Sequence, residues 1–172
     1  MNSQNQYLRM KSLVIPGCLF FFMILVCNPA IAQEQPPKPI QVTVSTLQNL
    51  SFGSFIQSGT SGTVTVTPDG LRTASGNLIL PNMSSNVSAA LFDVEALPGT
   101  LITILTGPDT QLSGTNGGFI FLTVGLSNTG SPFIATSSHT DVFIGGTLTV
   151  GALLANPAGA YSGSFQVTFI QQ

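Results

Sequence analysis

Strict alternation of apolar and polar residues runs through several segments of this chain and commits them to β-structure. The odd positions of the segment 161–170 carry Tyr161, Gly163, Phe165, Val167 and Phe169, and the even positions 162–168 carry serine, glutamine and threonine. The segment 63–67 repeats the pattern, with valine alternating with threonine. Successive side chains of a strand point to opposite faces, so both segments predict strands with one buried face. No stretch beyond residue 32 combines the period of a helix with capping residues.

Similar short segments recur along the chain and are separated by turn-forming residues. Examples are 89–96, 100–106, 119–126 and 140–144, and the segment 50–55 is expected to bend at Gly53. Pro68-Asp69-Gly70 and Asn116-Gly117-Gly118 are typical turn sequences. About eight or nine short strands at even spacing predict an all-β fold, an antiparallel β-sandwich.

The first 32 residues have the layout of a secretory signal peptide. A short basic start with Arg9 and Lys11 precedes an apolar block from Leu13 to Cys27, and Ala30-Ile31-Ala32 follows as a small-residue cleavage site. The apolar block has about fifteen residues, fewer than the roughly twenty that span a bilayer. We therefore expect cleavage between Ala32 and Gln33, export to the periplasm, cell surface or medium, and no transmembrane anchor in the mature chain.

Lipidation at Cys27 is the alternative use of this leader. Bacterial lipoprotein leaders place a small residue directly before the modified cysteine, whereas Val26 occupies that position here. The other cysteine, Cys18, also lies in the leader, so the mature chain would hold none. Such a chain excludes a disulfide framework, a thiol redox centre and a cysteine-based zinc site.

The mature chain is poor in charge, with two basic and six acidic side chains and thus a net charge of −4. This composition excludes a basic nucleic-acid-binding surface. Three of the residues 36–39 are proline, so residues 33–39 are expected to form an extended tether. Residues 40–172 follow as a single domain.

The domain begins with an alternating segment in which Ile40, Val42 and Val44 are the apolar positions. Two arrangements fit this pattern. The segment closes its own sandwich as the first edge strand, or it lies in the groove of a neighbouring subunit as a donated strand.

Side chains for catalysis or metal binding are scarce. His139, the only histidine, follows Ser137 and Ser138, but no nucleophile motif accompanies it, and we expect a solvent-facing loop histidine. Asp93 and Glu95 are two residues apart on an expected strand, so their side chains share one face. The apolar side chains of Phe92 and Val94 occupy the opposite face, and we therefore expect the two carboxylates to face solvent. The sequence therefore predicts no enzyme activity, no cofactor and no metal site.

Several motifs in fixed order resemble a family of exported bacterial domains of unknown function, similar in style to fimbrial (pilus) subunits. They are Leu50-Ser51-Phe52-Gly53, Gly62-Thr63-Val64-Thr65-Val66, Ala90-Leu91-Phe92-Asp93-Val94, Gly146-Thr147-Leu148-Thr149-Val150 and the segment Gly159–Thr168. The resemblance implies an immunoglobulin-like sandwich placed on or near the cell surface, without catalytic residues.

Two functions follow from these observations. The favoured one is a structural or adhesive module of the bacterial surface, whose partners are copies of itself or other surface subunits joined by β-strand addition. The alternative is a secreted module that binds a glycan or a host or matrix protein. Binding of ice or mineral through threonine faces such as Thr63, Thr65 and Thr67 is a minor form of that alternative, and an enzyme is the least favoured class.

Overall fold

The computed structural model describes residues 41–44, 48–81 and 86–172. Within these residues the chain is all β, as the alternation predicts, and contains no helix. The described residues thus include no helix of the length and apolarity that a membrane crossing requires. The signal peptide with its cleavage site at Ala32 and Gln33, Cys27, the tether 33–39 and Ile40 lie outside the described residues. A compact unit spans Lys38–Gln172.

The described part of the chain forms thirteen strand segments, more than the eight or nine expected. They are β1 (Gln41–Val44), β2 (Ser51–Phe52), β3 (Ile56–Val66), β4 (Arg72–Ile79), β5 (Val87–Ser88), β6 (Ala90–Glu95), β7 (Leu101–Thr106), β8 (Thr110–Gly114), β9 (Phe119–Ser127), β10 (Phe133–Ile134), β11 (His139–Val150), β12 (Tyr161–Ser162) and β13 (Val167–Gln171). The number of strands is higher than expected because some continuous segments of the sequence are divided into two strands that belong to different sheets.

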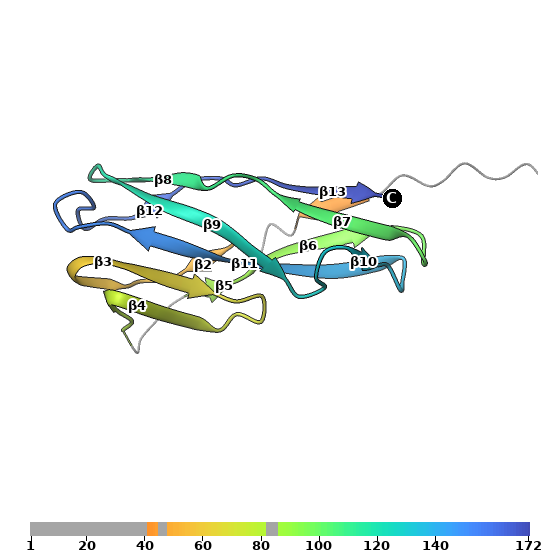
Figure 1. Ribbon diagram of the computed structural model, residues 1–172, viewed down its shortest axis with the longest axis horizontal. Helices are drawn as coiled ribbons and strands as arrows, with labels where there is room; N and C mark the ends of the chain where they lie inside the picture. Colours follow the sequence, from red (N-terminus) through yellow and green to blue (C-terminus); the bar gives the residue numbers. More distant parts are fainter. Residues whose placement is uncertain (1–40, 45–47, 82–85) are drawn as a thin grey trace, which may run out of the picture. The chain divides into compact units, whose positions relative to one another are not determined.

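Strand β11 is the centre of the largest sheet, whose order is β1-β6-β11-β9-β8-β12 (Figure 1). Along one edge β11 pairs first with β6 and then with β3, which in turn pairs with β4. Smaller sheets are formed by β10-β7-β13 and by β2-β5. All of these pairings are antiparallel, as expected for a sandwich of hairpins. The immunoglobulin-like strand order implied by the resemblance stays a prediction.

The change of partner along β11 takes place at Gly145. Ile144 pairs with Ala90 of β6, and Gly146 pairs with Val66 of β3. A Cβ atom on Gly145 would lie 2.2 Å from the carbonyl oxygen of Val66, far inside van der Waals contact. Glycine is therefore needed at this position for close approach of the two backbones.

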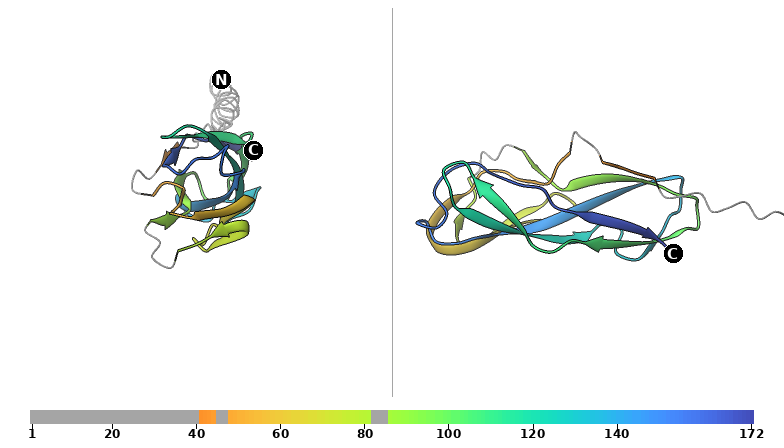
Figure 2. Two further views of the ribbon diagram at one scale, coloured as in Figure 1. Left: turned by 90° about the vertical axis from the view of Figure 1, so that its left-hand side faces the viewer. Right: turned by 90° about the horizontal axis from the view of Figure 1, so that it is seen from above.

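One apolar core lies between the sheets, and the strands surround it when the domain is seen end-on in the left panel of Figure 2. Buried and less buried residues alternate along β6 and along most of β9 and β11. The largest fully buried side chains are Ile102, Ile120, Ile144, Val64, Val66, Val94, Val142 and Val150. Burial of these residues supplies the main stabilisation of the fold.

The C-terminal segment departs from the single strand expected over 161–170. It consists of β12, which pairs with β8, and β13, which pairs with β7, with residues 163–166 between them in neither sheet. The expected faces are still present, because Phe165 and Phe169 pack against the core. Both side chains are only partly buried, and the Phe169 ring lies 5.6 Å from that of buried Phe92.

Hydroxyl side chains form a row across four strands on the outer face of the largest sheet. Thr73 of β4, Thr65 of β3, Thr147 of β11 and Thr123 of β9 are direct neighbours in register. The Oγ1 atoms of Thr65 and Thr147 are 2.9 Å apart and share a hydrogen bond. We refer to these four residues as the threonine row.

Candidate functional site

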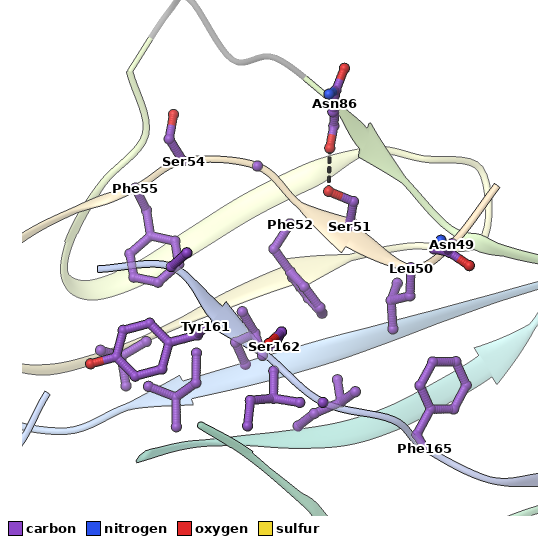
Figure 3. A pocket seen from close by; sticks show the side chains of 18 of the residues that line it. Asn49, Leu50, Ser51, Phe52, Ser54, Phe55, Asn86, Tyr161, Ser162 and Phe165 are labelled. Carbon is purple, nitrogen blue, oxygen red and sulfur yellow. Dashed lines mark hydrogen bonds between the residues drawn. The ribbon is translucent and has the colours of Figure 1, made fainter. Parts of the chain in front are cut away.

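The described domain contains a large open groove of about 1220 Å³. One side of it, the first wall, is formed by residues 48–57, which include β2. The opposite side, the second wall, is formed by residues 157–167, which include β12. Figure 3 shows the two walls facing each other, with Leu50, Phe52 and Phe55 on one and Tyr161 and Phe165 on the other.

At its start the first wall forms a ladder of only two residues, where Ser51 and Phe52 meet β5, and at its end Ile56 and Gln57 belong to β3 and pair with β4. Gly53 follows Phe52 at φ 65°, the left-handed region that favours glycine, so the strand bends here as the sequence predicts. Within the described residues, Gly53, Ser54 and Phe55 make no backbone–backbone hydrogen bond. A stretch of the wall therefore has backbone groups with no partner in a sheet.

Arg72 holds this bent wall in place. Its Nη1 donates to the carbonyl oxygens of Phe52 at 2.9 Å and Ser54 at 3.0 Å. Hydrogen bonds from a charged donor are stronger than those between neutral groups. The guanidinium thus fixes the bend without closing the groove.

The second wall is interrupted in the same way. Tyr161 and Ser162 pair with β8, and the carbonyl of Gln166 accepts a hydrogen bond from the amide of Gly107 at 2.9 Å. Between these points, Gly163, Ser164 and Phe165 make no backbone–backbone hydrogen bond to any described residue. Each wall thus has at least three consecutive residues outside any β-ladder.

The floor of the groove is the apolar core itself. It is lined by Ala90, Phe92, Leu112, Ile120, Leu122, Leu148 and Val150. No described residue that lines the groove carries a charge; its polar members are serine, asparagine, glutamine and tyrosine. The groove therefore offers apolar contact and backbone hydrogen bonds, and no acid, base or charged metal ligand.

The alternating N-terminal segment lies beside β6 rather than in this groove. Gln41–Val44 pairs antiparallel with β6, Val44 opposite Phe92 and Gln41 opposite Glu95. Its strand β1 is the outermost strand of the large sheet and pairs with β6 alone. Within one chain, β1 is thus an edge strand of its own sheet. Donation of this strand to a neighbouring subunit would occur only in an assembly of several chains.

His139 and the carboxylates Asp93 and Glu95 lie on a different surface, on neighbouring strands. Asp93 and Glu95 share the less buried face of β6, as predicted. His139 is the first residue of β11 rather than part of a loop, and its Nδ1 lies 3.1 Å from Oδ2 of Asp93. Among the described residues no serine hydroxyl contacts the imidazole, and no three metal-ligating side chains come together.

Replacing Asp93 with asparagine and Glu95 with glutamine is expected to change the free energy of unfolding by less than about 1 kcal/mol. The imidazole of His139 is 60% exposed and the Asp93 side chain 38%, so water screens their attraction. Asp141 lies directly opposite Asp93, and loss of one of two facing charges offsets part of the lost attraction. Urea denaturation of the double variant measures the effect, and a loss of several kcal/mol would contradict this assignment.

The groove was not identified from the sequence, although its walls contain a recognisable signal. Both walls place a glycine, Gly53 or Gly163, inside an otherwise alternating apolar segment. Such a glycine marks a bend or a close backbone approach. That two interrupted segments about 110 residues apart face each other is visible only in three dimensions.

A comparison with protein families identifies the chain through most of its length. Residues 42–170 match the model of the domain of unknown function DUF4402, and the chain therefore belongs to this family. No curated protein matches the chain, and no solved structure does. The expectation of an uncharacterised domain family is confirmed.

Proposed function

We propose that this member of the DUF4402 family is an exported structural or adhesive module of the bacterial cell surface, similar to a fimbrial subunit, that assembles by β-strand addition. The open groove carries this proposal. Its floor is apolar, and each of its walls has a stretch of backbone that forms no ladder with any residue the structure describes. An added strand needs these two features: backbone partners for affinity and pockets for alternate side chains for specificity.

The partner we propose is the alternating segment of another subunit, with Ile40, Val42 and Val44 as the apolar anchors. Every second side chain of a strand points the same way, so the three anchors would face the floor together. The polar residues between them would face outward. The lack of charge along the groove fits a segment that carries no charge from Ile40 to Leu47.

The segment gains hydrogen bonds on moving from its own sheet to a groove. At the sheet edge β1 pairs with β6 alone, whereas a strand in the groove has a wall on each side. Association of two chains costs translational and rotational entropy, which opposes this gain. Exchange of an identical element between copies of a chain is a common route to assembly when the gained hydrogen bonds and the lost entropy nearly balance.

A synthetic peptide with the sequence of Ile40–Leu47 tests the proposal. We expect it to bind the chain 33–172 and to slow amide hydrogen exchange at Gly53–Phe55 and Gly163–Phe165, because these amides acquire partners. A peptide with alternate backbone nitrogens methylated keeps its side chains but cannot form a ladder, and should bind about tenfold more weakly or worse. Equal binding of both peptides, or unchanged exchange at the two walls, would refute strand addition at this groove.

Export is the second part of the proposal, and it rests on the leader sequence. We expect material recovered outside the cytoplasm to begin at Gln33, because small residues occupy the positions before it. Intact-mass spectrometry of that material reads the N-terminus directly. A chain that begins at a diacylglycerol-modified Cys27 would instead make the protein a lipoprotein.

A further inference from the structure

Arg72 bridges a gap in the pairing of the groove's first wall. This wall pairs with β5 over residues 51–52 and with β4 over residues 56–57. Between these two ladders the guanidinium of Arg72 binds the carbonyl oxygens of Phe52 and Ser54. The side chain thus supplies hydrogen bonds where a neighbouring strand would otherwise supply them.

Arg72 reaches this wall from outside the groove. It lies opposite Val66 in the ladder between β3 and β4, and it is not one of the residues that line the groove. The residue is half-buried, and among the described residues its guanidinium forms no ion pair with a carboxylate. Loss of the guanidinium would therefore affect the path of the wall and leave the lining of the groove chemically unchanged.

The guanidinium satisfies acceptors only, because all of its hydrogen-bonding groups are donors. It occupies the carbonyls of Phe52 and Ser54. The carbonyls of Gly53 and Phe55, two residues that line the groove, accept no backbone hydrogen bond within the described part of the chain. The open acceptors of the bend thus lie on alternate residues, which is the spacing at which a strand presents its backbone groups to one partner.

A different side chain closes the backbone of β7 more completely. The Oγ atom of Ser131 accepts a hydrogen bond from the amide of Ile104 at 2.8 Å and donates one to its carbonyl at 3.0 Å. A hydroxyl both donates and accepts, so both backbone groups of Ile104 are occupied. Arg72, in contrast, closes one set of carbonyls in its wall and leaves the intervening ones open.

We infer that Arg72 is the positioning residue of the groove and sets the register in which a strand is added. This inference rests on the proposed strand addition and names the residue that selects the backbone groups of the first wall. An added strand then donates to the carbonyls of Gly53 and Phe55. A shift of one residue would require carbonyls that the guanidinium already holds, and it would turn the apolar anchors away from the floor. This selection acts on a strand of either direction.

The NMR shifts of the backbone carbonyl carbons test the register directly, because such a signal moves when its oxygen gains a hydrogen bond. On addition of the Ile40–Leu47 peptide to the chain 33–172, we expect the signals of Gly53 and Phe55 to move and those of Phe52 and Ser54 to stay. Equal movement of all four signals would show that the strand displaces the guanidinium, and it would overturn the inference. This measurement needs no variant.

The variant Arg72→Met, which keeps a long side chain without donors, tests the positioning role. We expect the NMR order parameters of Gly53–Phe55 to fall below about 0.6, the range of flexible backbone, while those of Gly163–Phe165 stay unchanged. The affinity for the peptide should fall about tenfold or more, because the wall is no longer pre-organised. The carbonyl signals of Phe52 and Ser54 should now move when the peptide is added.

The matched control is Asn128→Ala. The Asn128 side chain also makes two hydrogen bonds to backbone groups, the carbonyl of Asp141 and the amide of Phe143, and it does not line the groove. Its loss should change neither the order parameters of the first wall nor the affinity for the peptide.

Each other outcome overturns a defined statement. A folded Arg72→Met chain that binds the peptide with unchanged affinity and register would overturn the role of Arg72 and leave strand addition standing. An equal fall of the order parameters at both walls would indicate a general loosening of the domain and would also overturn that role. Failure of the unmodified chain to bind the peptide would overturn the proposed function and the assigned register with it.

Discussion

Replacing Gly145 with alanine is expected to lower the free energy of unfolding by about 3 kcal/mol or more, a large part of the 5–15 kcal/mol typical of a domain. The new Cβ atom would lie 2.2 Å from the carbonyl oxygen of Val66 and 3.0 Å from the carbonyl carbon of Thr67. Both are backbone atoms of the chain beside β11, so no side chain can turn away to make room. Relief requires separation of β11 from β3 at the centre of the largest sheet.

Gly99→Ala is the control for this substitution. Gly99 has φ 91° and no atom within 4 Å of the position of a Cβ. Alanine there suffers only the strain of the left-handed conformation, about 1–2 kcal/mol. Thermal and urea denaturation of both variants give the comparison, and a Gly145→Ala variant as stable as Gly99→Ala would show that β11 and β3 can separate at little cost.

Removal of residues 33–46 is expected to abolish self-association while leaving the domain folded. The deletion removes the strand that we propose to be donated, and among the described pairings it takes from the domain the four-residue ladder between β1 and β6. Net hydrogen-bond contributions near 1 kcal/mol each predict a loss of about 2–4 kcal/mol in the free energy of unfolding. Circular dichroism and sedimentation velocity measure the two effects separately.

The Ile40–Leu47 peptide extends this experiment. The truncated chain keeps both walls of the groove and should bind the peptide without assembling further. A truncated chain that is unfolded would identify the segment as an indispensable strand of its own sandwich. A truncated chain that stays fully stable and monomeric and ignores the peptide would defeat both arrangements and leave the segment a plain linker.

Local features of the fold were predictable from the sequence because local rules determine them. The alternation over 63–67 lies within β3 up to Val66, and Val64 and Val66 are buried as expected. The turn at Pro68-Asp69-Gly70 is closed by a hydrogen bond from the amide of Gly70 to the carbonyl of Thr67, with Gly70 at φ 79°. Turn chemistry and a period of two need no knowledge of distant partners.

The joining and breaking of strands could not be predicted, because they depend on those distant partners. The sequence suggests separate strands over 140–144 and 147–154, but residues 140–150 belong to one strand, β11, because β6 and β3 lie end to end along it, and residues 151–154 lie outside any strand. Conversely, the segment 161–170 looks continuous but is split between two sheets. Strand β8 has little hydrophobic signal of its own and is formed by pairing with β9 and β12.

The candidate site was the least predictable part. Within the described residues, the backbone along Gly53–Phe55 and Gly163–Phe165 belongs to no β-ladder, and no residue type encodes backbone that is left outside a sheet. The N-terminal segment, in contrast, could be singled out from its alternation alone. The segment that we propose to bind could therefore be predicted from the sequence, whereas the groove that we propose to receive it is visible only in the structure.

The threonine row has a consequence for the environments that the domain can tolerate. Thr73, Thr65, Thr147 and Thr123 place hydroxyl groups, which neither titrate near neutral pH nor carry charge, side by side on four strands. Salt weakens ion pairs between exposed charges, but it has no comparable screening effect on a hydroxyl–hydroxyl bond such as that between Thr65 and Thr147. The contact between β3 and β11 at this point is thus expected to hold equally well in dilute and in saline water, and in mildly acidic and mildly alkaline surroundings.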